Sequence, residues 1–266
     1  MKKYLHVHIL TFCKDLSLFY GTELIFKTLR TGFPNAKIIV TDNASIPEAK
    51  DRIEQLTKEN DCVFNEIIAR SIEHYDFIQN TIRHYADDTS LNATLVFLDP
   101  DICLWNSCED FDFDGLMAGR LIGGFNDSVT QTLTLPRLHT SFMWVPDPGM
   151  LQHEIRKLRA RRFDFEPFRP FSFRLKDTWY RYDTGAGLYM AVPDKLSTFK
   201  EEHLSHYDHI FSGSHINYLK SLYSNEVREL LLEVHSHAKK GNLNALKGIH
   251  KYIDETWWKI HGLAAM

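Results

Sequence analysis

The feature that most constrains this fold is an alternation, over the first hundred residues, of short apolar runs with amphipathic helical patterns. Such an alternation is typical of a parallel sheet with helices on its faces. It predicts strands at 5–12, 37–41, 62–68 and 94–98. The last run is continuously apolar, as expected of a central strand that is covered on both faces.

Helices are expected in the segments between these strands. One begins after Asp15, one begins at Ser45 and one covers residues 75–85, where apolar side chains recur at spacings of three and four. Ser45 and Glu48 have the spacing of a capping box, in which each side chain caps a backbone group of the other residue.

Beyond Asp101 the pattern predicts mixed strands without helical crossovers. We expect these strands at 116–123, 130–135 and 141–145, and one more strand at 187–192. The last forty residues predict two helices separated by Gly241. The fold class predicted from these patterns is α/β, with a central mixed, mainly parallel sheet flanked by helices and a C-terminal helical pair.

Residues 150–182 interleave arginine and lysine with phenylalanine, tryptophan and tyrosine, and we interpret them as a mobile flap. Three roles suit this basic-aromatic flap, since cations pair with phosphates and rings stack on sugars. It could be a lid on a diphosphate, a platform for an anionic or lipid-linked acceptor, or a solvated helix face.

Charge and composition exclude several classes of protein. The net charge of −4 over 266 residues gives no general attraction to nucleic acid. The sequence contains no G-x-x-x-x-G-K-[ST] and no G-x-S-x-G, which argues against a P-loop NTPase and a serine hydrolase. The chain begins without a signal-peptide core, its four cysteines form no C-x-x-C pair, and its apolar runs are shorter than a membrane span. We therefore expect a cytoplasmic protein.

Contact with a membrane is expected to be peripheral at most, at the inner face. Trp257 and Trp258 could make such a contact, but their spacing relative to Ile253 and Ile260 favours packing in the core.

Asp99 and Asp101 are the strongest candidates for chemistry. Three D-x-D tripeptides occur, and chance alone supplies about 1.5 in a chain with 20 aspartates, so the spacing itself is weak support. The position of Asp99 and Asp101 distinguishes them, because they follow the most apolar strand, at the sheet edge where open α/β sheets bind ligands. Two carboxylates on a turn stiffened by Pro100 suit a divalent cation, which can in turn hold a diphosphate.

A second polar cluster, Asp42 and Asn43, follows the strand expected at 37–41. Asp42 could accept hydrogen bonds from a ribose or a base. Alternatively, Asp42 and Asn43 form an Asx turn before the next helix.

Together these residues resemble the nucleotide-sugar glycosyltransferases of the GT-A fold, particularly the family-two-like bacterial enzymes. Residues 40–45 (VTDNAS) resemble the strand-two motif of that family, and residues 96–101 (VFLDPD) resemble its D-x-D strand. Three further matches follow in consistent order at 137–142, 182–185 and 209–214. The chain departs from the family at 10–13, which lacks a proline and an asparagine, and it lacks the Glu-Asp pair that many inverting members use as a base.

The resemblance implies roles for individual residues. Thr11 and Asp42 would contact the nucleoside, and the same cofactor site would include Phe12, Asn43, Arg70, Ser212 and Ser214. Asp99 would hold the ribose and, with Asp101, a Mn²⁺ or Mg²⁺ that bridges the two phosphates. His209, 108 residues after Asp101, would complete the metal shell, with His206 as the alternative ligand.

Acceptor activation needs a base within reach of a sugar hydroxyl. Asp183 is our first choice, because the small residues that follow it let a substrate approach the backbone. Alternatively, Asp183 is a turn residue before the strand expected at 187–192. His139 could line the acceptor pocket or form a hydrogen bond in the core.

The sequence therefore predicts a glycosyltransferase whose partners are a nucleoside-diphosphate sugar, with a UDP-sugar favoured, and a glycan or lipid-linked acceptor. We expect a catalytic domain at 1–215, divided into a nucleotide-binding half at 1–101 and an acceptor half at 102–215, followed by a helical extension at 216–266. Two alternatives remain: a nucleotide- or carbohydrate-binding protein of the same fold without transfer activity, and a sugar nucleotidyltransferase. The latter would need a glycine-rich loop after the first strand, and residues 11–15 contain no glycine.

Overall fold

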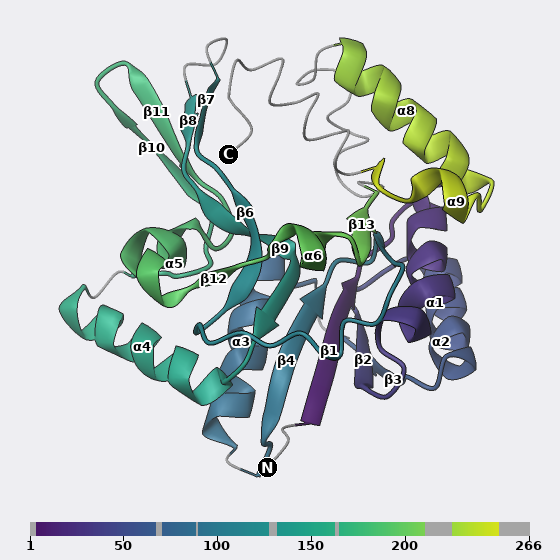
Figure 1. Ribbon diagram of the computed structural model, residues 1–266, viewed down its shortest axis with the longest axis horizontal. Helices are drawn as coiled ribbons and strands as arrows, with labels where there is room; N and C mark the ends of the chain where they lie inside the picture. The colour runs from purple at the N-terminus through teal and green to yellow at the C-terminus, as the bar shows by residue number, and fades with distance from the viewer. Residues whose placement is uncertain are drawn as a thin grey trace. The chain divides into compact units, whose positions relative to one another are not determined.

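The computed structural model describes residues 4–67, 71–88, 90–127, 132–162, 165–210 and 225–249 (Figure 1). Its main sheet has seven strands in the order β12-β6-β9-β4-β1-β2-β3. These strands are β1 (Tyr4–Thr11), β2 (Lys37–Asp42), β3 (Val63–Glu66), β4 (Ala93–Leu98), β6 (Ala118–Ile122), β9 (Arg137–Val145) and β12 (Ser197–Thr198). The sheet is mixed: β2 and β3 run parallel, as do β6 and β12, whereas β9 runs antiparallel to β4 and β6.

This arrangement confirms the predicted α/β class with a mixed, mainly parallel sheet flanked by helices. The chain divides into two compact units, each made of three chain segments. Unit 1 comprises Met1–His8, Ile72–Leu98 and Phe111–Lys200, and unit 2 comprises Ile9–Ser71, Asp99–Asp110 and Glu201–Met266.

Unit 1 is built around β4, whose Leu95 and Val96 are fully buried. Helices α3 (His74–Asp87) and α4 (Pro148–Arg161) pack against each other. The side chain of Asp147 accepts a hydrogen bond from the backbone N–H of Met150 at 2.9 Å, which caps the start of α4. A short helix, α5 (Ala186–Ala191), packs against β9.

A second sheet in unit 1 has the strand order β10-β11-β8-β7. Its strands are β7 (Phe125–Asp127), β8 (Thr132–Thr134), β10 (Phe171–Leu175) and β11 (Thr178–Tyr182). Strands β10 and β11 form an antiparallel hairpin, and β11 pairs with β8 in parallel. Consequently the described residues of the basic-aromatic flap at 150–182 form one helix and one hairpin. Part of it belongs to the core, because Phe168 is fully buried.

Unit 2 contains α1 (Tyr20–Gly32), α2 (Pro47–Glu59), α6 (Glu201–Leu204), α8 (Asn225–Lys239) and α9 (Leu243–Leu246). It also contains a two-stranded sheet of β5 (Ile102–Leu104) and β13 (Tyr207–His209). Helices α1 and α8 share an apolar cluster that includes Leu24, Cys103 and Leu231. Gly241, with φ +66°, makes the turn between α8 and α9. The second predicted C-terminal helix was expected to run through Leu246 and Ile249, but α9 ends at Leu246, and Gly248, with φ +84°, interrupts it. The residues beyond 249 lie outside the described part of the chain.

Two other local predictions are wrong. Residues 187–192 were expected to form a strand, but α5 covers most of them, and short apolar runs do not distinguish a strand from a helix. The capping box is absent as well: Ile46 is the N-cap of α2 with Pro47 at the first turn, and the hydroxyl of Ser45 instead accepts a hydrogen bond from the Cys13 N–H at 2.9 Å. The hydroxyl of Ser45 thus bonds to a residue distant in the sequence in place of the first turn of α2.

The domain boundary at 215 lies outside the described residues and stays a prediction.

Candidate metal and nucleotide site

Asp99, Asp101 and His209 lie together in unit 2. Each offers one ligand atom, and these atoms all lie within 4.8 Å of one another. The Nε2 of His209 lies 3.1 Å from the Oδ1 of Asp101, and both residues are buried. The carboxylates follow β4 directly in the chain, so the predicted D-x-D position and the predicted histidine meet in one cluster.

The pairing of two three-residue strands explains how residues so distant in sequence meet. β13 runs antiparallel to β5, with His209 opposite Ile102, the residue after Asp101. The Ile210 N–H donates to the Asp101 carbonyl at 3.0 Å and continues the ladder. The Ile102 N–H donates to the Asp99 carbonyl at 3.3 Å, which closes the turn that presents both carboxylates.

The buried side chain of Asp208 holds β13 in place through two hydrogen bonds. Its Oδ2 accepts hydrogen bonds from the indole Nε1 of Trp105 and from the Gly248 N–H, both at 2.6 Å. Asp208 was not among the residues predicted from the sequence to have a role. A strand of three residues is too short to show periodicity, so the pattern did not predict that Asp208 is buried. The one indication in the sequence was its place beside the candidate ligand His209.

His206, the alternative ligand, lies outside this cluster. Its Nδ1 is 2.7 Å from the carbonyl oxygen of Ser107, on an exposed part of unit 2. The geometry therefore favours His209.

Two carboxylates and one imidazole form a donor set that fits Mn²⁺ well and Mg²⁺ through its oxygen atoms. The burial of Asp101 supports this fit, because buried charges in proteins are paired or coordinate metals. Burial also raises the pKa of the nearby Tyr20 hydroxyl, and the negative charge of Asp101 raises it further.

Thr11 and Asp42 are fully buried side by side at the ends of β1 and β2. The hydroxyl of Thr11 lies 3.4 Å from Asp42 Oδ1, and the Asn43 N–H donates to the Thr11 carbonyl at 2.8 Å. Asp42 Oδ2 accepts from the Ser45 N–H at 3.1 Å, so the carboxylate serves the turn before α2. The turn alternative is thus present in the structure. A carboxylate has about four lone-pair sites and can accept further bonds.

Phe12 differs from its neighbours because 47% of its surface is exposed. The Nζ of Lys14 lies 4.9 Å from the centroid of this ring. The exposed ring can stack on a base, and the ammonium group of Lys14 beside it can attract a phosphate. Arg70, Ser212 and Ser214, the other predicted cofactor residues, lie outside the described residues.

Asp183 and His139, the predicted catalytic residues, both lie in unit 1. Asp183 Oδ2 forms an ion pair with Arg137 Nη2 at 2.9 Å, and its Oδ1 accepts from the Thr184 N–H at 2.9 Å. The side chain of Asp183 is 30% exposed, whereas that of Arg137 is 12% exposed. Burial lowers the pKa of Arg137, and the charge of Asp183 opposes that shift. His139 Nδ1 lies 2.5 Å from the Ser141 hydroxyl.

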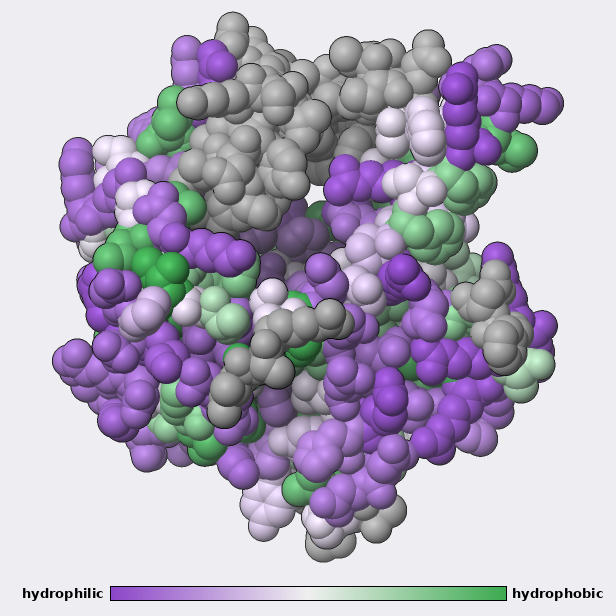
Figure 2. All heavy atoms as spheres, turned by 180° about the vertical axis from the view of Figure 1, so that it is seen from behind, coloured by the Kyte–Doolittle hydropathy of each residue, from purple (hydrophilic) through white to green (hydrophobic). Residues whose placement is uncertain are grey.

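In the described part of the chain, no helix is long and apolar enough to cross a membrane. The described part of the face in Figure 2 is mainly hydrophilic, with hydrophobic residues in small groups.

Comparison with known proteins finds similar folds among solved glycosyltransferases at low identity. The apo form of WbbM, a bifunctional glycosyltransferase, has a TM-score of 0.45 and 14% identity, over 75% of this chain and 39% of its own. GlyE from Streptococcus pneumoniae TIGR4 has a TM-score of 0.46 and 11% identity, over 92% of this chain and 65% of its own. The mannosyltransferase PcManGT from Pyrobaculum calidifontis, solved with GDP-Man and Mn²⁺, has a TM-score of 0.37 and 12% identity, over 95% of this chain and 74% of its own.

This chain therefore spans less than two thirds of the lengths of WbbM and GlyE. No protein-family model matches the sequence, and no curated protein matches it.

Proposed function

We propose that this protein is a metal-dependent glycosyltransferase, which transfers a sugar from a nucleoside-diphosphate sugar to a hydroxyl of a glycan or glycolipid precursor. The observation that carries the proposal is the cluster of Asp99, Asp101 and His209 in unit 2. Asp99 and Asp101 follow the buried strand β4 in the chain. Open α/β sheets bind ligands at the carboxyl ends of their strands. The resemblance of the sequence motifs to the GT-A family supports the same assignment.

Asp99, Asp101 and His209 would hold Mn²⁺ or Mg²⁺. A divalent cation bound there would neutralise the negative charge that grows on a leaving diphosphate. The ladder between β5 and β13 keeps Asp101 and His209 in place before any ligand binds, so little free energy is spent on ordering them.

Recognition of the nucleoside is proposed for the ends of β1 and β2. The buried contact between Thr11 and Asp42 fixes the loop that carries Phe12, and the exposed ring of Phe12 offers a stacking face for a base. Asn43 would complete this surface. A UDP-sugar is the first donor to test.

Acceptor activation is proposed for Asp183, with His139 lining the acceptor pocket. A base needs a carboxylate oxygen that solvent or substrate can reach, and Asp183 is partly exposed. The ion pair with Arg137 holds Asp183 in one orientation.

Thermal unfolding with a panel of UDP, GDP, CDP and dTDP, each with and without Mn²⁺, tests the donor half of the proposal. A ligand present at 100 times its Kd adds about 2.7 kcal/mol of stability, so a metal-dependent rise in Tm is expected with one base. Asp101→Asn should abolish this rise. The matched control is the double change Asp110→Asn and Asp112→Asn, which alters an exposed D-x-D of identical spacing. Equal rises in both variants would contradict the proposal.

Product analysis separates transfer from the alternatives. A transferase releases the nucleoside diphosphate, whereas a sugar nucleotidyltransferase releases or consumes pyrophosphate. A binding protein without transfer activity would show the metal-dependent rise in Tm, release no nucleoside diphosphate from any nucleotide sugar, and be unaffected by Asp183→Asn.

We also propose a cytoplasmic location, with peripheral contact at the inner membrane face at most. Fractionation of cells that express the chain tests this location.

A further inference from the structure

Large apolar side chains lie exposed on the β10–β11 hairpin of unit 1. Phe171, Phe173 and Leu175 alternate along β10 and are 44%, 40% and 57% exposed. Trp179 on β11 is 44% exposed. Figure 1 shows the turn of the hairpin extending away from α4 and α5 of the same unit. Exposed apolar side chains that gather on one element indicate a contact surface. We call residues 173–180 the hairpin tip.

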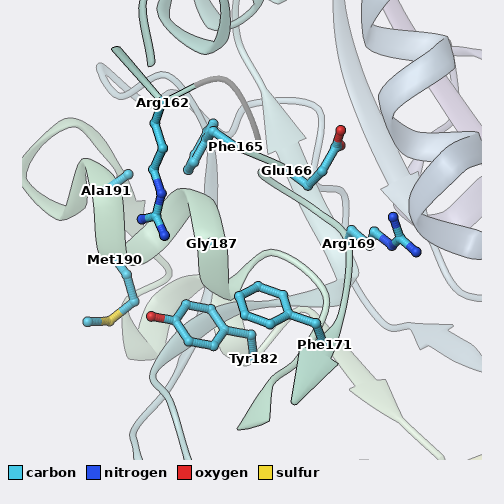
Figure 3. A pocket seen from close by; sticks show the side chains of 9 residues that line it. All are labelled: Arg162, Phe165, Glu166, Arg169, Phe171, Tyr182, Gly187, Met190 and Ala191. Carbon is cyan, nitrogen blue, oxygen red and sulfur yellow. The ribbon is translucent and has the colours of Figure 1, made fainter. Parts of the chain in front are cut away.

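The rings of the hairpin form two stacked cross-strand pairs. Phe171 and Tyr182 pair across the strands, and their ring centroids lie 4.4 Å apart with planes 12° from parallel. Phe173 and Tyr180 pair in the same way, with centroids 5.2 Å apart and planes 8° from parallel. Figure 3 shows the first pair side by side, lining a pocket of about 450 Å³, with the guanidinium group of Arg169 directed away from it. An apolar row therefore runs from this pocket to the hairpin tip.

The hairpin is held in place by its neighbour in the sheet. Trp179, Tyr180 and Arg181 of β11 pair in parallel with residues 132–134 of β8. The Leu135 N–H continues this contact and donates to the carbonyl oxygen of Arg181 at 3.0 Å. Because these backbone contacts fix β11, little conformational freedom is lost when the hairpin tip meets a partner.

The hairpin is basic in a chain that is acidic as a whole. Residues 171–182 contain three basic residues and one acidic residue, a net charge of +2, whereas the whole chain carries −4. The basic residues are all exposed: Arg174, Lys176 and Arg181. The Oδ1 of Asp177, the acidic residue, lies 3.7 Å from Arg174 Nη2 at the turn. Asp183, which follows the hairpin, is paired with Arg137. Positive charge thus accompanies the exposed apolar side chains, and together they suit a partner that is both negatively charged and apolar.

Two other kinds of partner fit these observations less well. A sugar stacks on an open ring face, and within each stacked pair of the hairpin the ring faces are turned toward each other. A second copy of the chain would pair along β10, the edge strand of its sheet, and would bring the like charges of two hairpins together. The surface of an anionic bilayer meets both requirements. Tryptophan and tyrosine are enriched at the boundary between lipid and water, and arginine and lysine extend their charged ends to the headgroups.

We propose that the hairpin tip binds the surface of a bilayer that contains anionic lipids. Phe173, Leu175 and Trp179 would enter the boundary between headgroups and acyl chains. Arg174 and Lys176 would pair with the lipid phosphates, and each basic residue near such a surface strengthens binding about fivefold. The binding itself does not depend on sugar transfer; that it brings the protein to a lipid-linked acceptor rests on the proposed function.

Flotation of the full chain with vesicles tests the proposal in EDTA and without nucleotide sugar. The vesicles consist of phosphatidylcholine alone or of phosphatidylcholine with about one third phosphatidylglycerol. The chain should bind the anionic vesicles about tenfold more tightly or better, and rising salt should weaken this binding. Because no donor or metal is present, the result can be read whether or not the protein transfers sugar.

Two double variants separate the charged part of the hairpin tip from its apolar part. The variants are Arg174→Gln with Lys176→Gln, and Leu175→Ser with Trp179→Ser. Each should weaken binding to the anionic vesicles about tenfold or more. The matched controls lie on α4 of the same unit, where Lys157 and Met150 are also exposed. Lys157→Gln and Met150→Ser should change binding less than about twofold, because the attraction falls off within a Debye length of the lipid surface.

Tryptophan fluorescence locates the contact without a polar substitution. Brominated lipids in the anionic vesicles quench a tryptophan that they touch, so the fluorescence of the wild type should fall on binding. Trp179→Phe keeps an aromatic ring at the hairpin tip, so this variant should still bind while the quenching is lost. This measurement tests the proposal even if a double variant fails to fold.

Four results would overturn the proposal. One is equal binding to the two kinds of vesicle, and another is unchanged binding in both double variants. The third is quenching that persists in Trp179→Phe, which would place the contact elsewhere, such as at Trp257 or Trp258. The fourth is self-association of the chain that Leu175→Ser abolishes, without binding to vesicles, which would assign the hairpin tip to a second copy.

Discussion

Asp208 is the residue through which the structure controls the position of His209. It is 1% exposed, and its Oδ2 accepts hydrogen bonds from Trp105 Nε1 and from the Gly248 N–H. These bonds join β13 to the segment after β5 and to the turn after α9. Asp208→Ala removes the acceptor of both bonds at once.

The expected cost follows from the two donors that lose their partner. A buried donor without an acceptor costs about 1–3 kcal/mol, so Asp208→Ala should lower the free energy of unfolding by about 2–6 kcal/mol. The lower half of this range is expected, because Trp105 is only partly buried and water can reach it. Asp208→Asn keeps an accepting oxygen but loses the charge, which costs about 1 kcal/mol per bond.

Urea denaturation and Mn²⁺ titration together test this reasoning. Asp208→Ala should weaken Mn²⁺ binding at least tenfold because His209 loses its fixed position, whereas Asp208→Asn should weaken it less than threefold. The control Asp51→Ala, on the exposed face of α2, should change stability by less than about 0.5 kcal/mol. The reasoning is refuted if Asp208→Ala unfolds within about 1 kcal/mol of the wild type, or if it loses stability but keeps full Mn²⁺ affinity.

Three further predictions concern packing, pH and charge. A Cβ atom at Gly32 would lie 2.6 Å from Leu104 Cδ1, so Gly32→Ala should cost about 1–3 kcal/mol in urea denaturation; a cost below about 0.5 kcal/mol would contradict it. Burial raises the pKa of the Cys108 thiol from 9.0 to about 12, so above pH 9 the unfolded state loses this proton first and stability falls as pH rises. Between pH 7 and 10.5 the wild type should lose about 2 kcal/mol more than Cys108→Ala does, and equal losses would exclude the effect. A double-mutant cycle with Arg137→Met and Asp183→Asn should give a coupling of about 1–2 kcal/mol, since the pair is only partly exposed; additive effects would show that the ion pair contributes nothing.

The pattern of apolar residues predicted an element correctly where one face or both faces of that element pack against the core. The continuous apolar run at 94–98 became β4, and the spacings of three and four near residue 78 became α3. Such segments are long enough for their period to identify them. The same approach failed at α5, because a six-residue helix spans fewer than two turns and its apolar residues resemble those of a strand.

Contacts between distant segments were not predictable from periodicity. The hydroxyl of Ser45 could serve the first turn of α2 or the Cys13 N–H, and the structure uses it for the latter. The pairing of β11 with β8 and the close approach of Gly187 to the backbone of Glu166 depend on which backbone segments meet. No local pattern predicts such contacts. The approach of His209 to Asp101 was expected only from the resemblance to a known family.

Two of the three D-x-D sequences of this chain show why position, and not spacing, decides the metal site. Asp99 and Asp101 have the same separation as Asp110 and Asp112. Asp101 is buried beside an imidazole that a strand pair holds in place, whereas Asp110 and Asp112 are exposed, and no group of metal ligands forms around them among the described residues. Dispersed carboxylates in water gain little from a cation, because each must first lose its own hydration and its freedom to rotate. A pair fixed by a turn, with a third ligand supplied by the β5–β13 ladder, has already met that cost during folding, and for this reason only the first pair is expected to bind Mn²⁺ tightly.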